Sequence, residues 1–120
     1  MAQPVVHFEI IGPDATGLQA FYGKVFDWKI DANNPMEYGV VEAGEGGIAG
    51  GISKGDGDST AATFYVQVDD PQAALDQIET LGGKTVMPVV TIPGMVTFAQ
   101  FSDPAGNVIG LVATEIPPAD

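Results

Sequence analysis

The residues best suited to chemistry are His7 and Glu9, which lie two positions apart in the apolar stretch 5–10. An imidazole has an intrinsic pKa suited to a general base. A carboxylate can attract an amine, or act as a base if its pKa is raised. We expect both side chains to share one face of a strand and to contact a ligand. Alternatively, His7 is a polar residue bonded to a neighbour or a water, and Glu9 is solvated.

A second stretch, residues 62–68, repeats this alternation half a chain later. Thr63, Tyr65 and Gln67 alternate with apolar residues and therefore share one strand face. The Tyr65 ring can stack on an organic ligand, and the Gln67 amide can hydrogen-bond to it. The alternative is that these residues only fill a cavity.

Each of these two strands is followed by a helical pattern. In the first half, the apolar stripe comprises Leu18, Phe21, Tyr22, Val25 and Phe26. Phe21, Phe26 and Trp28 are expected in the core. In the second half, Asp70 is a favourable N-cap and Pro71 suits the first helical position. Further strands are expected at residues 27–30, 38–42 and just after the glycine-rich 44–51, then at 84–90, 96–101 and 108–113.

Placing His7 on Thr63 aligns Leu18 with Ala74 without a gap, which indicates a duplicated unit. We predict an α+β fold: two βαβββ modules forming a cupped mixed sheet, with helices on the convex side. The 120 residues make one domain. Module 1 covers about residues 4–53, a linker about 53–61, module 2 about 62–115, and a loose tail 116–120. The cup would hold the polar side chains of both strands.

Composition limits the function. The net charge is −12, and all four cationic side chains are lysines. Nucleic acid binding needs a basic surface, and carboxylate or phosphate ligands are usually held by arginine, so these partners are disfavoured. Acidity favours a cationic or neutral ligand, or simply confers solubility. There is no cysteine, no apolar run of membrane-spanning length and no signal-peptide pattern, so we predict a cytoplasmic protein.

Four segments together resemble the vicinal oxygen chelate superfamily, which includes glyoxalase I, extradiol dioxygenases, fosfomycin-resistance enzymes and bleomycin-binding proteins. They are VVHFEI (5–10), AFYGKVFDWKI (20–30), YVQVDDPQAALDQIETLGGK (65–84) and FSDPAGNVIGL (101–111). The resemblance covers nearly the whole chain and implies the glyoxalase-like fold of paired βαβββ modules. It also implies a homodimer.

In metal-dependent members of that family, four strand positions supply ligands, and by spacing these look like His7, Gly50, Thr63 and Gly110. Only His7 carries a usual ligand group, whereas a catalytic metal ordinarily has about three protein ligands. We therefore predict no metal site and no cofactor. Gly50 and Gly110 would instead open space on the floor of the cup, or allow close backbone packing.

Two functions follow from the resemblance. The first is a metal-free small-molecule binding protein of the bleomycin-resistance kind, with His7, Glu9, Thr63, Tyr65, Gln67, Gly50 and Gly110 around the ligand. The second is a glyoxalase-like lyase or isomerase acting on a small carbonyl compound, with His7 and Glu9 as acid–base residues. An extradiol dioxygenase needs two histidines and a carboxylate, so the single histidine disfavours it.

Overall fold

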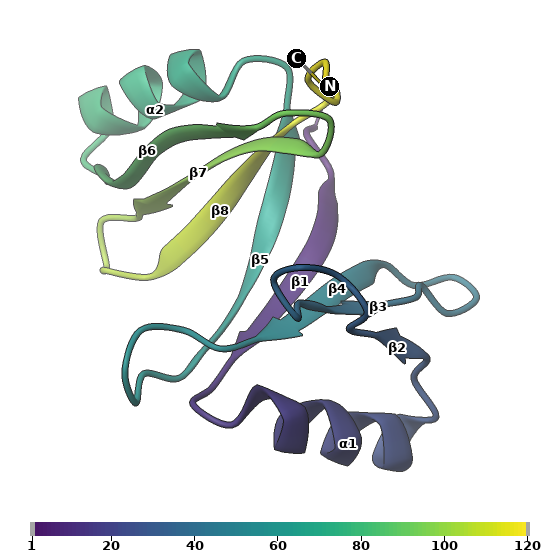
Figure 1. The fold of residues 1–120 in the computed structure, drawn as a ribbon. Helices are drawn as coiled ribbons and strands as arrows, with labels where there is room; N and C mark the ends of the chain where they lie inside the picture. Colours follow the sequence, from purple (N-terminus) through teal and green to yellow (C-terminus); the bar gives the residue numbers. More distant parts are fainter. Residues whose placement is uncertain (1, 120) are drawn as a thin grey trace. The chain divides into compact units, whose positions relative to one another are not determined.

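The computed structural model describes residues 2–119, which form two compact units: residues 6–63, and residues 2–5 together with 64–119 (Figure 1). We call these the first and second units. The elements follow the order β1 (Val5–Ile11), α1 (Ala15–Phe26), β2 (Ile30–Asp31), β3 (Gly39–Val41), β4 (Ala49–Ser53), β5 (Ala61–Val68), α2 (Pro71–Thr80), β6 (Lys84–Ile92), β7 (Val96–Ser102) and β8 (Val108–Ala113).

In the first unit the strand order is β2-β3-β4-β1. β1 and β4 run parallel, while the β3–β4 and β2–β3 pairs are antiparallel. The α1 helix packs over one face, where Gln19 donates a 2.9 Å hydrogen bond to the Ile52 carbonyl. Ile52 and Val41 are almost completely buried beneath it. The opposite face of these strands carries His7 and Glu9.

The α1 helix begins after the Asp14 cap, whose carboxylate accepts from the Gly17 N–H at 3.0 Å. It ends at Asp27, which adopts the left-handed conformation (φ 58°). The strand predicted for residues 27–30 therefore starts later, at Ile30.

The prediction that Phe21 and Phe26 lie in the core is wrong, because their side chains are 57% and 55% exposed. Successive helical residues are rotated by about 100°, so one helix cannot turn its whole apolar stripe toward the sheet. Tyr22 occupies the inward position and stacks on Trp28, with ring centroids 5.5 Å apart. Trp28 in turn contacts the Phe8 ring of β1.

The second unit repeats this topology, with strand order β5-β8-β7-β6 and a parallel β5–β8 pair. Its core cluster comprises Val68, Leu75, Ala99 and Leu111. The α2 helix begins as predicted: Asp70 accepts from the Ala73 N–H at 3.1 Å, and Pro71 takes the first helical turn. Residues 2–5 join this unit, where Gln67 N–H donates to the Pro4 carbonyl at 2.8 Å.

The turn between β7 and β8 is organised by Asp103. Its carboxylate accepts from the backbone N–H groups of Ala105 and Asn107, both at 2.9 Å, and from the Asn107 side chain. The Asn107 side-chain hydrogen bond is the main reason that the pKa of Asp103 lies below its usual value. The residues D-P-A-G-N (103–107) thus form a turn held by the Asp103 side chain.

The predicted α+β, glyoxalase-like fold of two βαβββ modules is confirmed. The predicted cup, and the predicted position of the helices on its convex side, depend on how the two modules are placed relative to each other. Both stay predictions. Within residues 2–119, neither helix has the length and apolar character needed to cross a bilayer.

Candidate functional site

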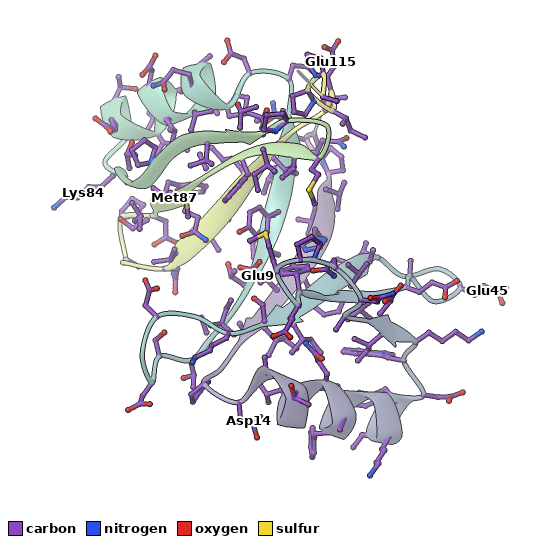
Figure 2. All side chains as sticks on the ribbon, in the orientation of Figure 1. Glu9, Asp14, Glu45, Lys84, Met87 and Glu115 are labelled. Atoms are coloured by element: carbon purple, nitrogen blue, oxygen red, sulfur yellow. The ribbon has the colours of Figure 1, made fainter. Side chains whose placement is uncertain are left out.

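His7 and Glu9 lie on the same face of β1, as predicted. In the parallel register with β4, His7 is opposite Ala49 and Glu9 is opposite Gly51. Glu9 is labelled on β1 in Figure 2. Both side chains are half-buried. The face therefore has small residues beside its two ionisable groups, which leaves room for another side chain to reach them.

That side chain is Tyr38, which immediately precedes β3. Its hydroxyl lies 2.9 Å from His7 Nε2 and donates to Glu9 Oε2 at 3.2 Å. The Tyr38 and His7 rings are nearly parallel, with an interplanar angle of 16°. Tyr38 thus joins the histidine and the carboxylate into one hydrogen-bonded row.

The chain before β3 fixes Tyr38 in place. The Asn34 side chain donates to the Tyr38 carbonyl at 2.7 Å and accepts from the Tyr38 N–H at 3.0 Å. Between them, Glu37 adopts the left-handed conformation (φ 53°), and its N–H donates to the Asn34 carbonyl at 3.0 Å. Two hydrogen bonds from one amide hold both polar groups of the Tyr38 backbone, so the phenol is preorganised.

Gly51 makes room for the phenol. A Cβ at this position would overlap the Tyr38 hydroxyl and ring, with no space for both. The glycine is therefore required because the tyrosine ring approaches the β4 backbone closely. A glycine covered by an aromatic ring from the neighbouring strand is a common way to stabilise such a position.

The hydrogen bonds define the protonation of the row. A phenol carries one hydrogen, and Tyr38 gives it to Glu9. With that hydrogen directed at Glu9, the contact between His7 and Tyr38 is a hydrogen bond in the imidazole tautomer that carries its proton on Nε2. Burial lowers the pKa of His7 below its usual 6.5, because desolvation disfavours the charged ring. The His7 imidazole is therefore neutral at neutral pH, and a Glu9 carboxyl oxygen accepts from the phenol.

Gly50 lies apart from this row. It pairs with Phe8 on the opposite, α1 face, and a Cβ at residue 50 would overlap the Phe8 ring. It therefore cannot open space beside His7. By strand pairing, the counterpart of Gly110 is Gly51 and not Gly50. Glu9 is opposite Gly51 in the first unit, just as Tyr65 is opposite Gly110 in the second.

In the second unit, Tyr65 and Gly110 come together. The two are register partners, and the Tyr65 ring lies over the glycine, where a Cβ would overlap it. Gln100 of β7 donates to the Tyr65 hydroxyl at 3.3 Å. Gln67 lies two residues further along the same face of β5, and Thr63 is half-buried earlier in that strand. Gly110 supports a tyrosine ring here instead of leaving an open floor.

The donor set does not fit the metal that the resemblance implies. Of the four implied positions, only His7 carries an imidazole or carboxylate. Across residues 2–119, no three His, Asp or Glu side chains come close enough to share an ion. The Tyr38 hydroxyl instead contacts His7 Nε2 and donates to Glu9.

Sequence reasoning missed Tyr38, Asn34 and Gln100. Tyr38 reads simply as the start of a strand, since nothing local marks its hydroxyl as reaching β1. The available signal was Gly51, a glycine on the His7 face that needs an aromatic neighbour to cover it. Asn34, followed by Pro35, reads only as a turn.

Comparisons with known proteins agree with this fold. A hypothetical protein from Bacillus halodurans C-125 superposes with a TM-score of 0.69 at 11% identity, covering 96% of each chain. Methylmalonyl-CoA epimerase from Mycobacterium tuberculosis gives 0.66 at 13% identity, covering 97% of this chain and 88% of its own. A halotolerant catechol dioxygenase, BphC, gives 0.66 at 13% identity over 98% of this chain, but this chain spans only 42% of its length.

A search of curated proteins found no sequence match. The family model described as the Glyoxalase/Bleomycin resistance protein/Dioxygenase superfamily matches residues 5–111, nearly the whole chain. That span contains nearly all of both βαβββ units, with β8 ending two residues beyond it, and every residue of the His7–Tyr38–Glu9 row. The chain therefore belongs to the glyoxalase/bleomycin resistance protein/dioxygenase superfamily.

Proposed function

We propose that this protein binds a small cationic or neutral organic molecule, without the metal site that many members of its superfamily use. The observation that carries the proposal is the His7–Tyr38–Glu9 row, in which one phenol contacts both ionisable side chains. A neutral imidazole and a carboxylate attract hydrogen-bond donors and amines far better than anions.

The charge of the chain supports the same ligand class. With a net charge of −12 and no arginine, the surface repels anionic ligands and steers cations toward it. We include Tyr65, Gln67 and Thr63 of the second half in the proposal as ligand-binding positions, with Gly110 beneath the Tyr65 ring, but not Gly50, which faces α1. We further propose a cytoplasmic homodimer that sequesters its ligand.

The proposal is tested by asking what the purified protein carries and what it binds. Native mass spectrometry identifies any co-purifying molecule. Calorimetry then compares hexylammonium, as a cationic probe, with 1-hexanol, as a neutral one. In Glu9→Gln, which keeps an acceptor for the Tyr38 hydroxyl, hexylammonium should bind several-fold more weakly while 1-hexanol is unchanged. Equal effects on both probes would refute electrostatic selection by Glu9.

A second function is favoured by one observation: burial keeps His7 neutral and therefore able to accept a proton. Solved relatives of the same fold include an epimerase and a glyoxalase. Under this hypothesis the chain is a lyase or isomerase acting on a small carbonyl compound, with His7 and Glu9 as acid–base residues. Turnover lost in both His7→Ala and Glu9→Ala, with binding retained, would establish it over sequestration.

The metal content of the purified protein distinguishes both of these functions from a metal-dependent reaction. Protein purified without chelator is expected to contain no stoichiometric zinc, nickel, manganese or iron. A transition metal at one equivalent, lost in His7→Ala, would contradict the proposal.

A further inference from the structure

The face that carries His7 and Glu9 continues outward across the first unit. Glu9 is opposite Gly51, Gly51 is opposite Val40, and Val40 is opposite Asp31, so one row crosses β1, β4, β3 and β2. Three strand spacings separate its ends, a distance of roughly 14 Å. The Tyr38 phenol covers Gly51 within this row, and an open groove begins beyond it.

The groove has a volume of about 430 Å³ and lies over β2, β3 and the start of β4. Its apolar lining includes Val40, Ala43 and Ala49. Val40 is 47% exposed, whereas its neighbour Val41, which also lines the groove together with Ile30, is only 1% exposed. Ala49 is the register partner of His7, so the groove and the histidine are adjacent on one surface.

The charges at the groove are mainly negative. Asp31 and Glu42 line it with exposed carboxylates, and Asp31 is held by the Asn33 N–H at 2.8 Å. Lys29 is the one cation among the lining residues; its aliphatic stem can cover apolar surface while its ammonium stays in water. The Glu42 N–H donates at 3.0 Å to the carbonyl of Lys29, the residue just before β2, and this hydrogen bond fixes the Glu42 backbone beside that strand.

We propose that this groove is a subsite for the hydrophobic body of a ligand that bears a protonated amine, with Asp31 and Glu42 adding to the attraction that Glu9 exerts on that amine. The inference rests on the proposed function, since it extends the same binding face and narrows the ligand to an amphiphilic amine. An apolar floor with carboxylates at its edge fits such a molecule, because the floor can remove its hydrophobic body from water and the carboxylates attract its ammonium group. An amphiphilic carboxylate would meet two like charges.

The test uses nuclear magnetic resonance of the full chain with hexylammonium, 1-hexanol and hexanoate as matched probes. Hexylammonium is expected to shift the amide signals of Val40, Ala43 and Ala49, and to bind more tightly than 1-hexanol and hexanoate. Glu42→Gln and Asp31→Asn should each weaken hexylammonium by about two- to fivefold, as for exposed charge pairs.

Two further variants keep the test specific. Glu45→Gln removes the same charge from the β3–β4 turn, outside the groove, and should leave binding unchanged (Figure 2). Ala49→Leu fills the groove and should abolish the shifts at Val40 and Ala43 for hexylammonium and 1-hexanol alike.

Each remaining outcome is decisive. Shifts confined to His7, Glu9 and Tyr38 would overturn the groove while leaving the proposed function intact. Hexanoate binding as tightly as hexylammonium, or no shifts in the groove with any probe, would also overturn it. The proposed function itself fails separately, if Glu9→Gln leaves the preference for the cationic probe unchanged.

Discussion

At the scale of single residues, the Tyr38 hydroxyl is the central group of the site, because its one oxygen contacts both His7 and Glu9. Tyr38→Phe keeps the ring over Gly51 but removes both hydrogen bonds. We expect it to lower the free energy of unfolding by about 1–2 kcal/mol, since half-buried polar groups lose their partner. Urea denaturation measures this. Tyr22→Phe, within the α1 aromatic cluster, is the matched control, and an equal loss there would contradict a special role for Tyr38.

A substitution at Gly51, which lies against the Tyr38 ring, tests the position of that ring. Gly51→Ala places a methyl group where the Tyr38 phenol lies, so the ring must move away from His7 and Glu9. Overpacking of this kind costs about 1–3 kcal/mol. The control is Gly44→Ala, because a Cβ there meets nothing within 4 Å. If denaturation shows equal stability for both variants, the ring does not depend on the glycine.

His7 should make stability depend on pH in a definite direction. Its pKa is lowered in the folded protein, so between that value and the unfolded value of 6.5 the unfolded chain binds more protons. Stability from this group is therefore complete above pH 6.5 and decreases as the pH falls toward the folded pKa. Denaturation at a series of pH values should show a shallower dependence in His7→Gln. An unchanged slope would mean that burial does not disfavour the imidazolium.

Much of the chemistry at this scale could not be read from the sequence. His7 and Glu9 share a face because alternation along one strand is local information. Tyr38 belongs with them only because β3 and β4 pair in one particular register, and that register is set by tertiary contacts. Placing His7 on Thr63 implies a constant offset, but strand pairing matches Gly51, not Gly50, with Gly110. The second half has three extra residues before its last strand, so the offset between matching residues of the two halves is larger there than at His7 and Thr63.

At the scale of elements, the two helices share one starting device. Asp14 and Asp70 occupy equivalent positions in the duplicated units, and each carboxylate accepts a backbone N–H three residues on. We expect Asp14→Ala and Asp70→Ala each to cost about 1 kcal/mol. Thermal or urea unfolding measures both, and Asp→Asn at either site should retain most of the stability. A loss as large in Asp→Asn would show that capping is not the cause.

The helix starts were predictable because caps and proline act locally, whereas the packing of α1 was not. A stripe of apolar residues shows that a helix has an apolar face, but not how much of that face the sheet can cover. In α2 the buried positions are Pro71 and Leu75, yet in α1 no residue is buried. A cluster of large rings holds α1 instead: Tyr22 stacks on Trp28, and the Phe26 ring packs against Trp28 as well.

At the scale of the whole molecule, the two units repeat one topology but not one site. Each places a tyrosine ring over a glycine: Tyr38 over Gly51, and Tyr65 over Gly110. In the first unit the tyrosine contacts a histidine and a carboxylate, and in the second it accepts a hydrogen bond from the Gln100 amide. The duplication thus predicts the scaffold but not which side chains surround each tyrosine.

The strongest whole-molecule property is charge, and it leads to a prediction about salt. A net charge of −12 on 120 residues attracts cations over long range, and ions screen that attraction within about 10 Å at 0.1 M. Hexylammonium should therefore bind progressively more weakly as sodium chloride is raised, whereas 1-hexanol should not. Calorimetry at several ionic strengths checks this. Equal salt dependence for the two probes would mean that the acidity serves solubility alone, because a neutral molecule has no net charge for the surface to attract.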